Sequence, residues 1–172
     1  MVILGINYVF HDSTACIVRD GELVVAIEEE RLTRDKHTGA FPQRAVETCL
    51  ARAGLGFEDI DHVALSFDPT LNAGRKTLYA LRHARHARPF LAHEWRVMVG
   101  KARYVRRWLA RTWPDERRRP RLHHVPHHLA HVAGTFYVSP YESAALLSMD
   151  GSGEWSTTLM GEGRGTDIRV FG

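Results

Sequence analysis

The sequence predicts a mixed α/β fold, and three observations lead to this prediction. Two strand-like runs flank the dipeptide Asp20-Gly21, which is a strong hairpin signal. A helical segment at 42–54 and a further strand at 61–67 follow, and a strand–helix–strand order favours a mixed sheet with flanking helices. Strand-like runs resume at 143, so the chain holds one complete half of an architecture and the opening strands of a second, similar half.

The opening segment has the pattern of three antiparallel strands, at 2–8, 13–19 and 22–28. In the third run, Leu23 and Ile27 belong to an alternating series typical of a strand with one more deeply buried face. We therefore expect a meander at the N-terminal side of the sheet.

The segment 42–54 predicts an amphipathic helix. Pro42 suits the first helical position, and Gly54 suits the residue after the last turn. The apolar residues between them recur with helical spacing and form one stripe: Ala45, Val46, Cys49 and Leu50.

The middle of the chain carries most of the positive charge. Residues 70–121 hold 15 Lys and Arg against 3 Asp and Glu, whereas the rest holds 8 against 17. Such asymmetry can mark a contact with nucleic acid or another polyanion. The alternative, which we favour, is an Arg-rich helical insertion at about 70–120, with two or three amphipathic helices whose arginines pair with an acidic body or with a part of the protein outside this chain.

A histidine pair and one aspartate form the most informative motif. His127 and His131 lie four residues apart, so on a helix their side chains share one face. Asp150 ends a strand-like run, where a turn can direct its carboxylate toward that helix. Two imidazoles and one carboxylate leave open coordination positions, which is typical of a working metal site. The alternative is a polar helix start with no ligand role, and we expect His128 to be a packing or supporting group.

Gly151, Ser152 and Gly153 follow that aspartate in a tight turn. Glycine lets backbone N–H groups approach a phosphate closely, so we predict nucleotide or phosphate binding here, although an ordinary hairpin turn has the same letters. Glu154 is an unusual neighbour for an anion, and contact with a ribose or with the acceptor is one role for it.

Composition bounds the class of protein. No apolar run reaches the roughly 20 residues that span a bilayer, and Cys16 and Cys49 form no recognisable disulfide or metal framework. These features favour a cytoplasmic protein without a membrane segment. The final run, 168–171, ends without a following helix and would leave an exposed edge, so we expect an N-terminal piece of a larger protein.

These motifs together resemble the N-terminal region of the O-carbamoyltransferases, which include nodulation-factor and antibiotic-tailoring enzymes. The resemblance covers nearly the whole chain except the Arg-rich segment. The residues that carry it are Ile3-Leu4-Gly5-Ile6, His11-Asp12-Ser13, Glu28-Glu29-Glu30-Arg31, Lys36-His37, Phe41-Pro42, His127-His128-Leu129-Ala130-His131 and Asp150-Gly151-Ser152-Gly153-Glu154-Trp155.

The resemblance implies an actin/hexokinase-like fold, with a divalent metal (Fe²⁺ favoured, Zn²⁺ or Mn²⁺ as alternatives) on His127, His131 and Asp150. A further aspartate ligand would lie beyond Gly172. It also implies that ATP and carbamoyl phosphate yield carbamoyl-adenylate in a C-terminal domain absent from this chain. The carbamoyl group then passes to a hydroxyl of a sugar, an aminoglycoside or another natural product.

The resemblance also maps His11 and Lys36 onto catalytic positions. His11 could take the proton of the acceptor hydroxyl with Asp12 orienting its ring, and Lys36 could hold a carbamoyl or phosphate oxygen. Without the resemblance, His11 would be interpreted as an ordinary loop histidine.

Two other functions remain open. A tRNA threonylcarbamoyl transferase would use the same metal geometry, and its basic segment would then bind RNA. A non-catalytic metal-binding interaction module is the second alternative, since the adenylate-forming part is missing. We rank both below small-molecule carbamoyl transfer, and we expect no nucleic-acid partner and no contact with a membrane. The expected protein partner is the remainder of the same enzyme or a separate C-terminal chain.

Overall fold

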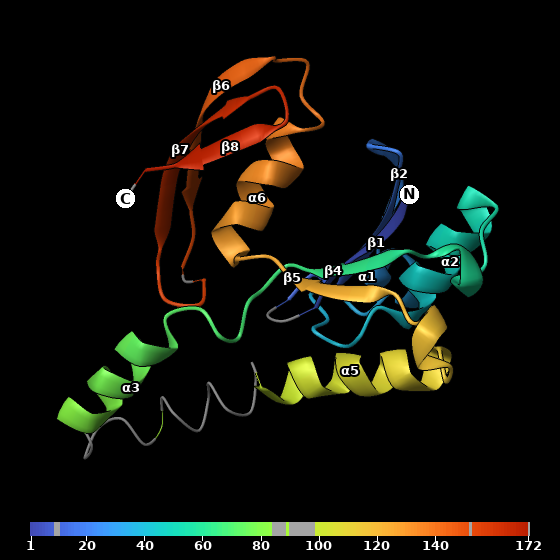
Figure 1. Ribbon diagram of the computed structural model, residues 1–172, viewed down its shortest axis with the longest axis horizontal. Coiled ribbons are helices and arrows are strands. Elements are labelled where there is room, and N and C mark those ends of the chain that lie inside the picture. The colour runs from blue at the N-terminus through green and yellow to red at the C-terminus, as the bar shows by residue number, and fades with distance from the viewer. Residues whose placement is uncertain (9–10, 84–88, 90–98, 152, 172) are drawn as a thin grey trace.

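The computed structural model describes residues 1–8, 11–83, 89, 99–151 and 153–171, and it contains two β-sheets with a helix between them (Figure 1). The first sheet has the strand order β3-β2-β1-β4-β5, and the second has the order β6-β7-β8. The strands are β1 (Val2–Asn7), β2 (Thr14–Arg19), β3 (Glu22–Glu28), β4 (His62–Leu65), β5 (Arg121–His124), β6 (Ser143–Met149), β7 (Thr158–Arg164) and β8 (Asp167–Val170).

Five α-helices lie between these strands in the described parts of the chain. They are α1 (Glu29–Thr33), α2 (Gln43–Ala53), α3 (Ala73–Arg82), α5 (Gly100–Thr112) and α6 (His127–Phe136), with short 3-10 turns η1 (Phe57–Asp59) and η3 (Glu116–Arg118). None of the helices described here is long and apolar enough to cross a bilayer.

The first sheet is mixed, as predicted. β1 pairs antiparallel with β2, placing Leu4 opposite Ile17, and parallel with β4, placing Leu4 beside Val63. Residues directly opposite each other on paired strands point to the same face of the sheet, so these three buried residues share one face. The predicted burial of Leu23 is wrong: β3 is an edge strand, and this side chain remains half exposed.

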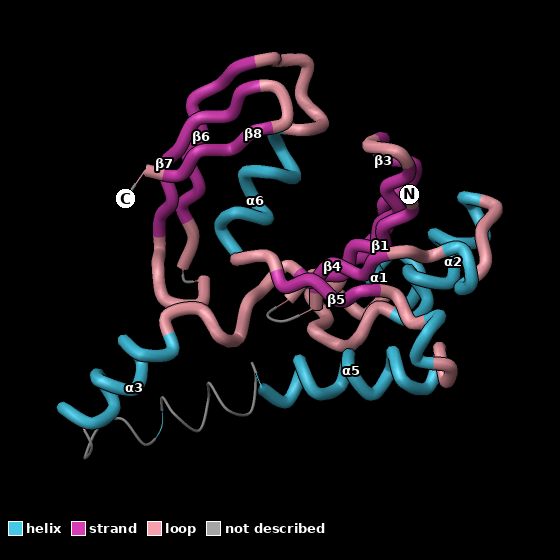
Figure 2. Tube along the Cα trace, in the orientation of Figure 1, coloured by secondary structure: helices cyan, strands magenta, loops and turns pink. Residues whose placement is uncertain are grey.

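Two helices cover the buried face of this sheet and share one core with it. α2 buries the predicted stripe of four apolar residues, and Gly54 ends the helix in the left-handed region at φ +67°. α5 buries Val105, Trp108 and Leu109 against the same core, and Figure 2 shows it running along the first sheet.

The Arg-rich segment is therefore partly structural. Both described helices, α3 and α5, are amphipathic, as predicted, and α5 is a core element. The remainder of the predicted helical stretch, at 84–88 and 90–98, lies outside the described residues.

The second sheet is an antiparallel meander, and α6 packs on one of its faces. Val132 and Phe136 of the helix form a small core with Leu146 of β6. The strand-like runs predicted from residue 143 onward are confirmed as this meander, and with them the opening strands of a second half.

Two glycines test this packing. A Cβ at Gly163 on β7 would lie 2.6 Å from a ring carbon of Phe136, whereas one at Gly134 on α6 would meet open space. We expect Gly163→Ala to destabilise the protein by about 1–3 kcal/mol through overpacking. Gly134→Ala should stabilise it by up to about 1 kcal/mol through helix propensity. Urea unfolding measures both, and equal effects would contradict the packing of α6 on β7.

Candidate functional site

The start of α6 is fixed by a buried carboxylate. Glu154, only 5% exposed, accepts hydrogen bonds from the backbone N–H of His127 at 2.9 and 3.1 Å and from that of Asp68 at 2.7 Å. The first N–H groups of a helix lack partners within the helix, so this carboxylate acts as an N-terminal cap. Glu154 therefore ties the β6–β7 loop to α6 and to the segment after β4, and a contact of this carboxylate with a ribose or with the acceptor stays a prediction.

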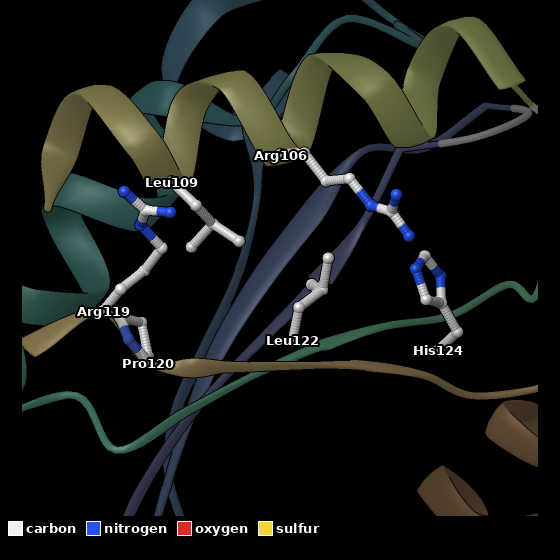
Figure 3. Close-up of a pocket in the computed structure, with 6 residues that line it drawn as sticks. All are labelled: Arg106, Leu109, Arg119, Pro120, Leu122 and His124. Atoms are coloured by element: carbon white, nitrogen blue, oxygen red, sulfur yellow. The ribbon is translucent and has the colours of Figure 1, made fainter. Parts of the chain in front are cut away.

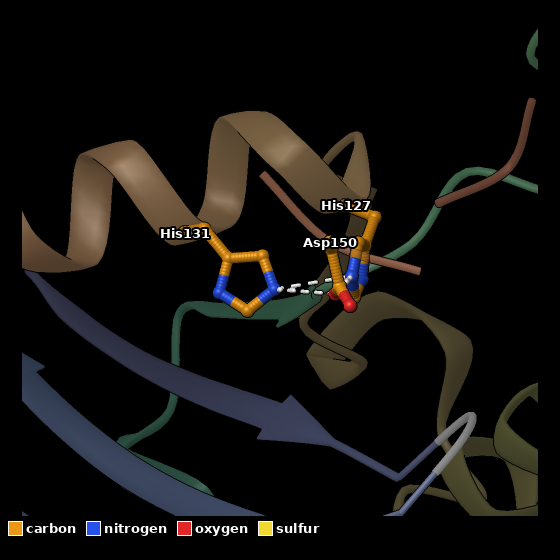
Figure 4. Close-up of side chains that lie close together, drawn as sticks. All are labelled: His127, His131 and Asp150. Atoms are coloured by element: carbon orange, nitrogen blue, oxygen red, sulfur yellow. Dashed lines mark hydrogen bonds and ion pairs between the residues drawn. The ribbon is translucent and has the colours of Figure 1, made fainter. Parts of the chain in front are cut away.

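The predicted metal ligands converge on one point (Figure 4). His127 Nε2 lies 2.9 Å from Asp150 Oδ2 and 3.0 Å from His131 Nε2. The third side of this triangle, from His131 Nε2 to Asp150 Oδ2, is 3.5 Å. Helical spacing on α6 positions the two imidazoles, and the end of β6 positions the carboxylate.

These distances fit a divalent cation. For metal–ligand bonds of about 2.1 Å, ligands at right angles lie about 3.0 Å apart. All three distances are close to that value, and two imidazoles with one carboxylate form the ligand set of many iron sites that keep open positions. We call these three residues the triad, and their role as metal ligands stays a prediction.

The triad is closed on one side and open on the other. His127 is buried, whereas the side chains of His131 and Asp150 are 53% and 41% exposed. The hydrogen bond with His127 and a second from the Gly151 N–H lower the pKa of Asp150 to about 2. Burial and the neighbouring His127 lower the pKa of His131. At neutral pH the triad thus offers an ionised carboxylate and, at His131, a neutral ring.

His128 supports the triad without pointing into it. Its Nε2 donates to the Ser156 carbonyl at 2.8 Å, and its Nδ1 lies 2.8 Å from the Ser148 hydroxyl. These contacts hold α6 against β6 and the following loop, which confirms the predicted packing role.

The glycine-containing loop is internally bonded. The Gly151 N–H donates to Asp150 Oδ1 at 2.6 Å, and the Gly153 N–H donates to the Ser156 carbonyl at 2.8 Å. Glycine at 153 allows close approach of the helix, because a Cβ there would lie 3.1 Å from His128. Ser152 lies outside the described residues. Phosphate binding by this loop stays a prediction, and it would require exchange of these internal bonds.

The structure brings together His11, Asp12 and His37, one of which the sequence interpretation missed. Asp12 accepts from His11 Nδ1 at 2.6 Å and from His37 Nδ1 at 2.9 Å. These bonds, from His11 first, lower the pKa of Asp12. Lys36 is exposed in the turn beside His37. The Lys36-His37 pair was visible in the sequence, but its link to Asp12 spans 25 residues and gave no periodic signal.

The triad predicts a pH dependence of metal binding. Protonation of His131 removes a ligand nitrogen, and its pKa lies below the usual 6.5. We expect metal affinity to be constant from about pH 7 to 8. It should fall as the pH drops through the lowered pKa of His131, where the ring becomes protonated. Equilibrium dialysis with Zn²⁺ measures this. A loss of affinity only near the carboxyl pKa of about 2 would show that the imidazoles are not ligands.

Comparisons with known proteins agree with these features. Residues 2–171 match a family model described as Carbamoyltransferase N-terminus. The uncharacterized Synechocystis protein sll1178 is 34% identical over 172 residues, which cover 96% of this chain and 28% of that protein. Nodulation protein NolNO of Sinorhizobium fredii is 31% identical over 164 residues, covering 95% of this chain and 23% of that protein. The chain thus spans about a quarter of the length of these relatives.

Solved structures agree on the fold. YeaZ from Pseudomonas aeruginosa superimposes with a TM-score of 0.51 at 15% identity, covering 100% of this chain and 64% of that one. A second structure, titled as an uncharacterized protein with similarity to peptidase YEAZ, gives a TM-score of 0.50 at 13% identity, covering 99% of this chain and 63% of its own. These likenesses confirm the predicted actin/hexokinase-like fold.

Proposed function

The chain belongs to the carbamoyltransferase family through its N-terminal region, and on this premise we propose that the protein transfers a carbamoyl group to a hydroxyl of a small-molecule or sugar acceptor. The proposed donor is carbamoyl-adenylate, formed from ATP and carbamoyl phosphate in a C-terminal part of the enzyme. The convergence of His127, His131 and Asp150 is the observation that carries the proposal, because it supplies a charged centre for this chemistry.

In the proposed reaction the acceptor oxygen attacks the carbonyl carbon of carbamoyl-adenylate. A carbon–oxygen bond forms to the acceptor, and the bond from the carbonyl carbon to the phosphate oxygen breaks, releasing AMP with that electron pair. The hydroxyl proton must leave, and negative charge develops on the carbonyl oxygen and on the leaving phosphate. The site therefore needs a base and an electrostatic partner.

The connection between β1 and β2, which carries His11 and Asp12, supplies the proposed base. The Asp12 carboxylate accepts a hydrogen bond from His11 Nδ1–H, which leaves His11 Nε2 with the lone pair that takes the hydroxyl proton. His37 binds the other oxygen of Asp12 and so fixes the carboxylate. Lys36, in the same turn, is the proposed partner of a carbamoyl or phosphate oxygen.

His127, His131 and Asp150 would hold the divalent metal, and this ligand set suits Fe²⁺ as well as Zn²⁺ or Mn²⁺. Such an ion supplies positive charge that stabilises an oxygen becoming anionic. The lowered pKa of Asp150 and of His131 keeps both groups in the form that binds a cation. Glu154 and His128 fix the start of α6, and with it the direction of both imidazoles.

A second candidate is threonylcarbamoyl transfer to tRNA, favoured by the excess of Lys and Arg in residues 70–121. A protein that binds tRNA through this segment would lose affinity steeply with added salt. Salt-dependent tRNA binding together with a tRNA product would replace the small-molecule proposal.

The test is a transfer assay on the full-length enzyme with ATP, carbamoyl phosphate and a panel of alcohols. We expect a carbamoylated alcohol whose formation requires both co-substrates, stops after chelation and returns with Fe²⁺. Residues 1–172 alone should bind metal but form no product. Undiminished transfer by metal-free enzyme would contradict the proposed role of the triad.

A further inference from the structure

A cavity of about 370 Å³ lies between α5 and β5 (Figure 3). It is lined by Arg106, Leu109, Arg119, Pro120, Leu122 and His124. Its volume lies in the range of small-molecule pockets. The lining combines an apolar surface with two guanidinium groups and an imidazole, and none of these six residues is acidic. The cavity shares no residue with the triad or with the connection between β1 and β2 that carries His11 and Asp12.

One lining group has an unused hydrogen-bonding atom. His124 Nδ1 lies 3.1 Å from the carbonyl oxygen of Phe67, which can only accept, so Nδ1 carries the proton. Nε2 of the same ring is buried and has no hydrogen-bond partner among the described residues. Buried polar atoms without a partner are rare in folded proteins, so this nitrogen is available to a bound molecule.

The two arginines provide oriented donors. Figure 3 shows the guanidinium of Arg106 extending from α5 toward His124, and in the described part of the chain it has neither a hydrogen bond nor an ion pair. Arg119 is anchored by its Nε, which donates to the Trp113 carbonyl at 3.2 Å. Its Nη1 lies 3.5 Å from Glu116, whose side chain is 85% exposed. An ion pair this exposed contributes little free energy, so a bound anion can replace Glu116 at Nη1.

We propose that this cavity binds the phosphate group of a phosphorylated small molecule. The second pKa of a phosphomonoester is about 6, so near neutral pH its dianion readily takes up one proton. That proton can bridge a phosphate oxygen and His124 Nε2, while another oxygen accepts from Arg106. Arg119 lies at the opposite end of the cavity, beside the rest of the bound molecule (Figure 3). A sulfate or carboxylate carries no such proton at this pH. The site also assigns a role to part of the positive charge of residues 70–121, for which the proposed carbamoyl transfer has no role.

Calorimetric titration of the protein with inorganic phosphate and with sulfate, at low ionic strength, tests the proposal. We expect phosphate to bind at least about tenfold more tightly than sulfate. Arg106→Gln should weaken phosphate binding about tenfold or more. Arg107→Gln is the matched control: it removes the same charge from the next position of α5, outside the cavity, and should change the affinity by less than about twofold.

Two substitutions at His124 separate its nitrogens. Asn places an amide donor near the position of Nδ1 and keeps the bond to Phe67, but it has no counterpart of Nε2. Gln reaches the position of Nε2. We expect His124→Asn to lose most phosphate affinity and His124→Gln to keep part of it, with both variants checked for folding by circular dichroism. The proposal is overturned by equal binding of sulfate, by equal losses in Arg106→Gln and Arg107→Gln, or by a short RNA that displaces phosphate from this face.

Discussion

His131→Ala is expected to remove bound metal and carbamoyl transfer together. The substitution deletes one of three groups that meet within 3.5 Å, and disturbing even a supporting group of a metal ligand typically costs 10- to 100-fold in affinity. We therefore expect metal affinity to fall by more than about 100-fold and transfer by about 1000-fold or more. Because His131 is half exposed on α6 and Ala favours helices, the fold should survive. Elemental analysis of bound metal and the transfer rate of the full-length enzyme measure both effects.

The matched control is His123→Ala. His123 lies on β5, is exposed, and contacts His62 rather than the triad. It should keep metal content and transfer rate within about twofold, since exposed substitutions seldom disturb structure. Transfer at the parent rate by a metal-free His131→Ala enzyme would remove the triad from the mechanism, whereas equal losses in both variants would indicate a general effect of histidine removal.

Local sequence signals predicted most of the elements. The hairpin follows from Asp20-Gly21, whose glycine adopts a positive φ of 89°, and α2 follows from Pro42 and Gly54 at its two ends. These signals act within a few residues, so the strand and helix boundaries could be inferred without tertiary information.

Features that depend on distant contacts were less visible. Whether the apolar stripe of α5 faces a core or solvent depends on the sheet that it meets, and the dominance of Arg in that segment favoured a peripheral insertion. Leu23 alternates as in a covered strand, but coverage ends at the sheet edge. The deep burial of Glu154 arises from backbone donors 27 and 86 residues away.

The candidate sites divide in the same way. The spacing of His127 and His131 is a property of one helix, so their common face could be predicted, and Asp150 followed from the end of a strand. His37 contacts Asp12 across a segment that contains β2, β3 and α1, and both residues have positive φ, at 55° each. Such conformations are set by the surrounding fold, and the letters alone did not indicate them.

Glu154→Ala is expected to cause the largest loss of stability among the substitutions considered. It leaves the N–H groups of His127 and Asp68 without their acceptor in a buried location, and it removes a negative charge from the start of α6. We expect a decrease of about 2–4 kcal/mol in the free energy of unfolding, which corresponds to roughly 5–15 °C in Tm for a chain of this size. Metal affinity should fall as well, because the freed start of α6 no longer holds His127 against Asp150. Differential scanning calorimetry and metal titration measure these two effects.

Glu162→Ala provides the comparison. Glu162 lies on β7, more than half exposed, and pairs with Arg169 at 3.6 Å, so its removal should cost less than about 1 kcal/mol and leave metal binding unchanged. Glu154→Gln should fall between the two, since an amide oxygen can still accept one of the hydrogen bonds without the charge. If Glu154→Ala proved no more harmful than Glu162→Ala, the carboxylate would not be the group that joins the β6–β7 loop to α6. The geometry of the triad would then have to be held by α6 and β6 alone.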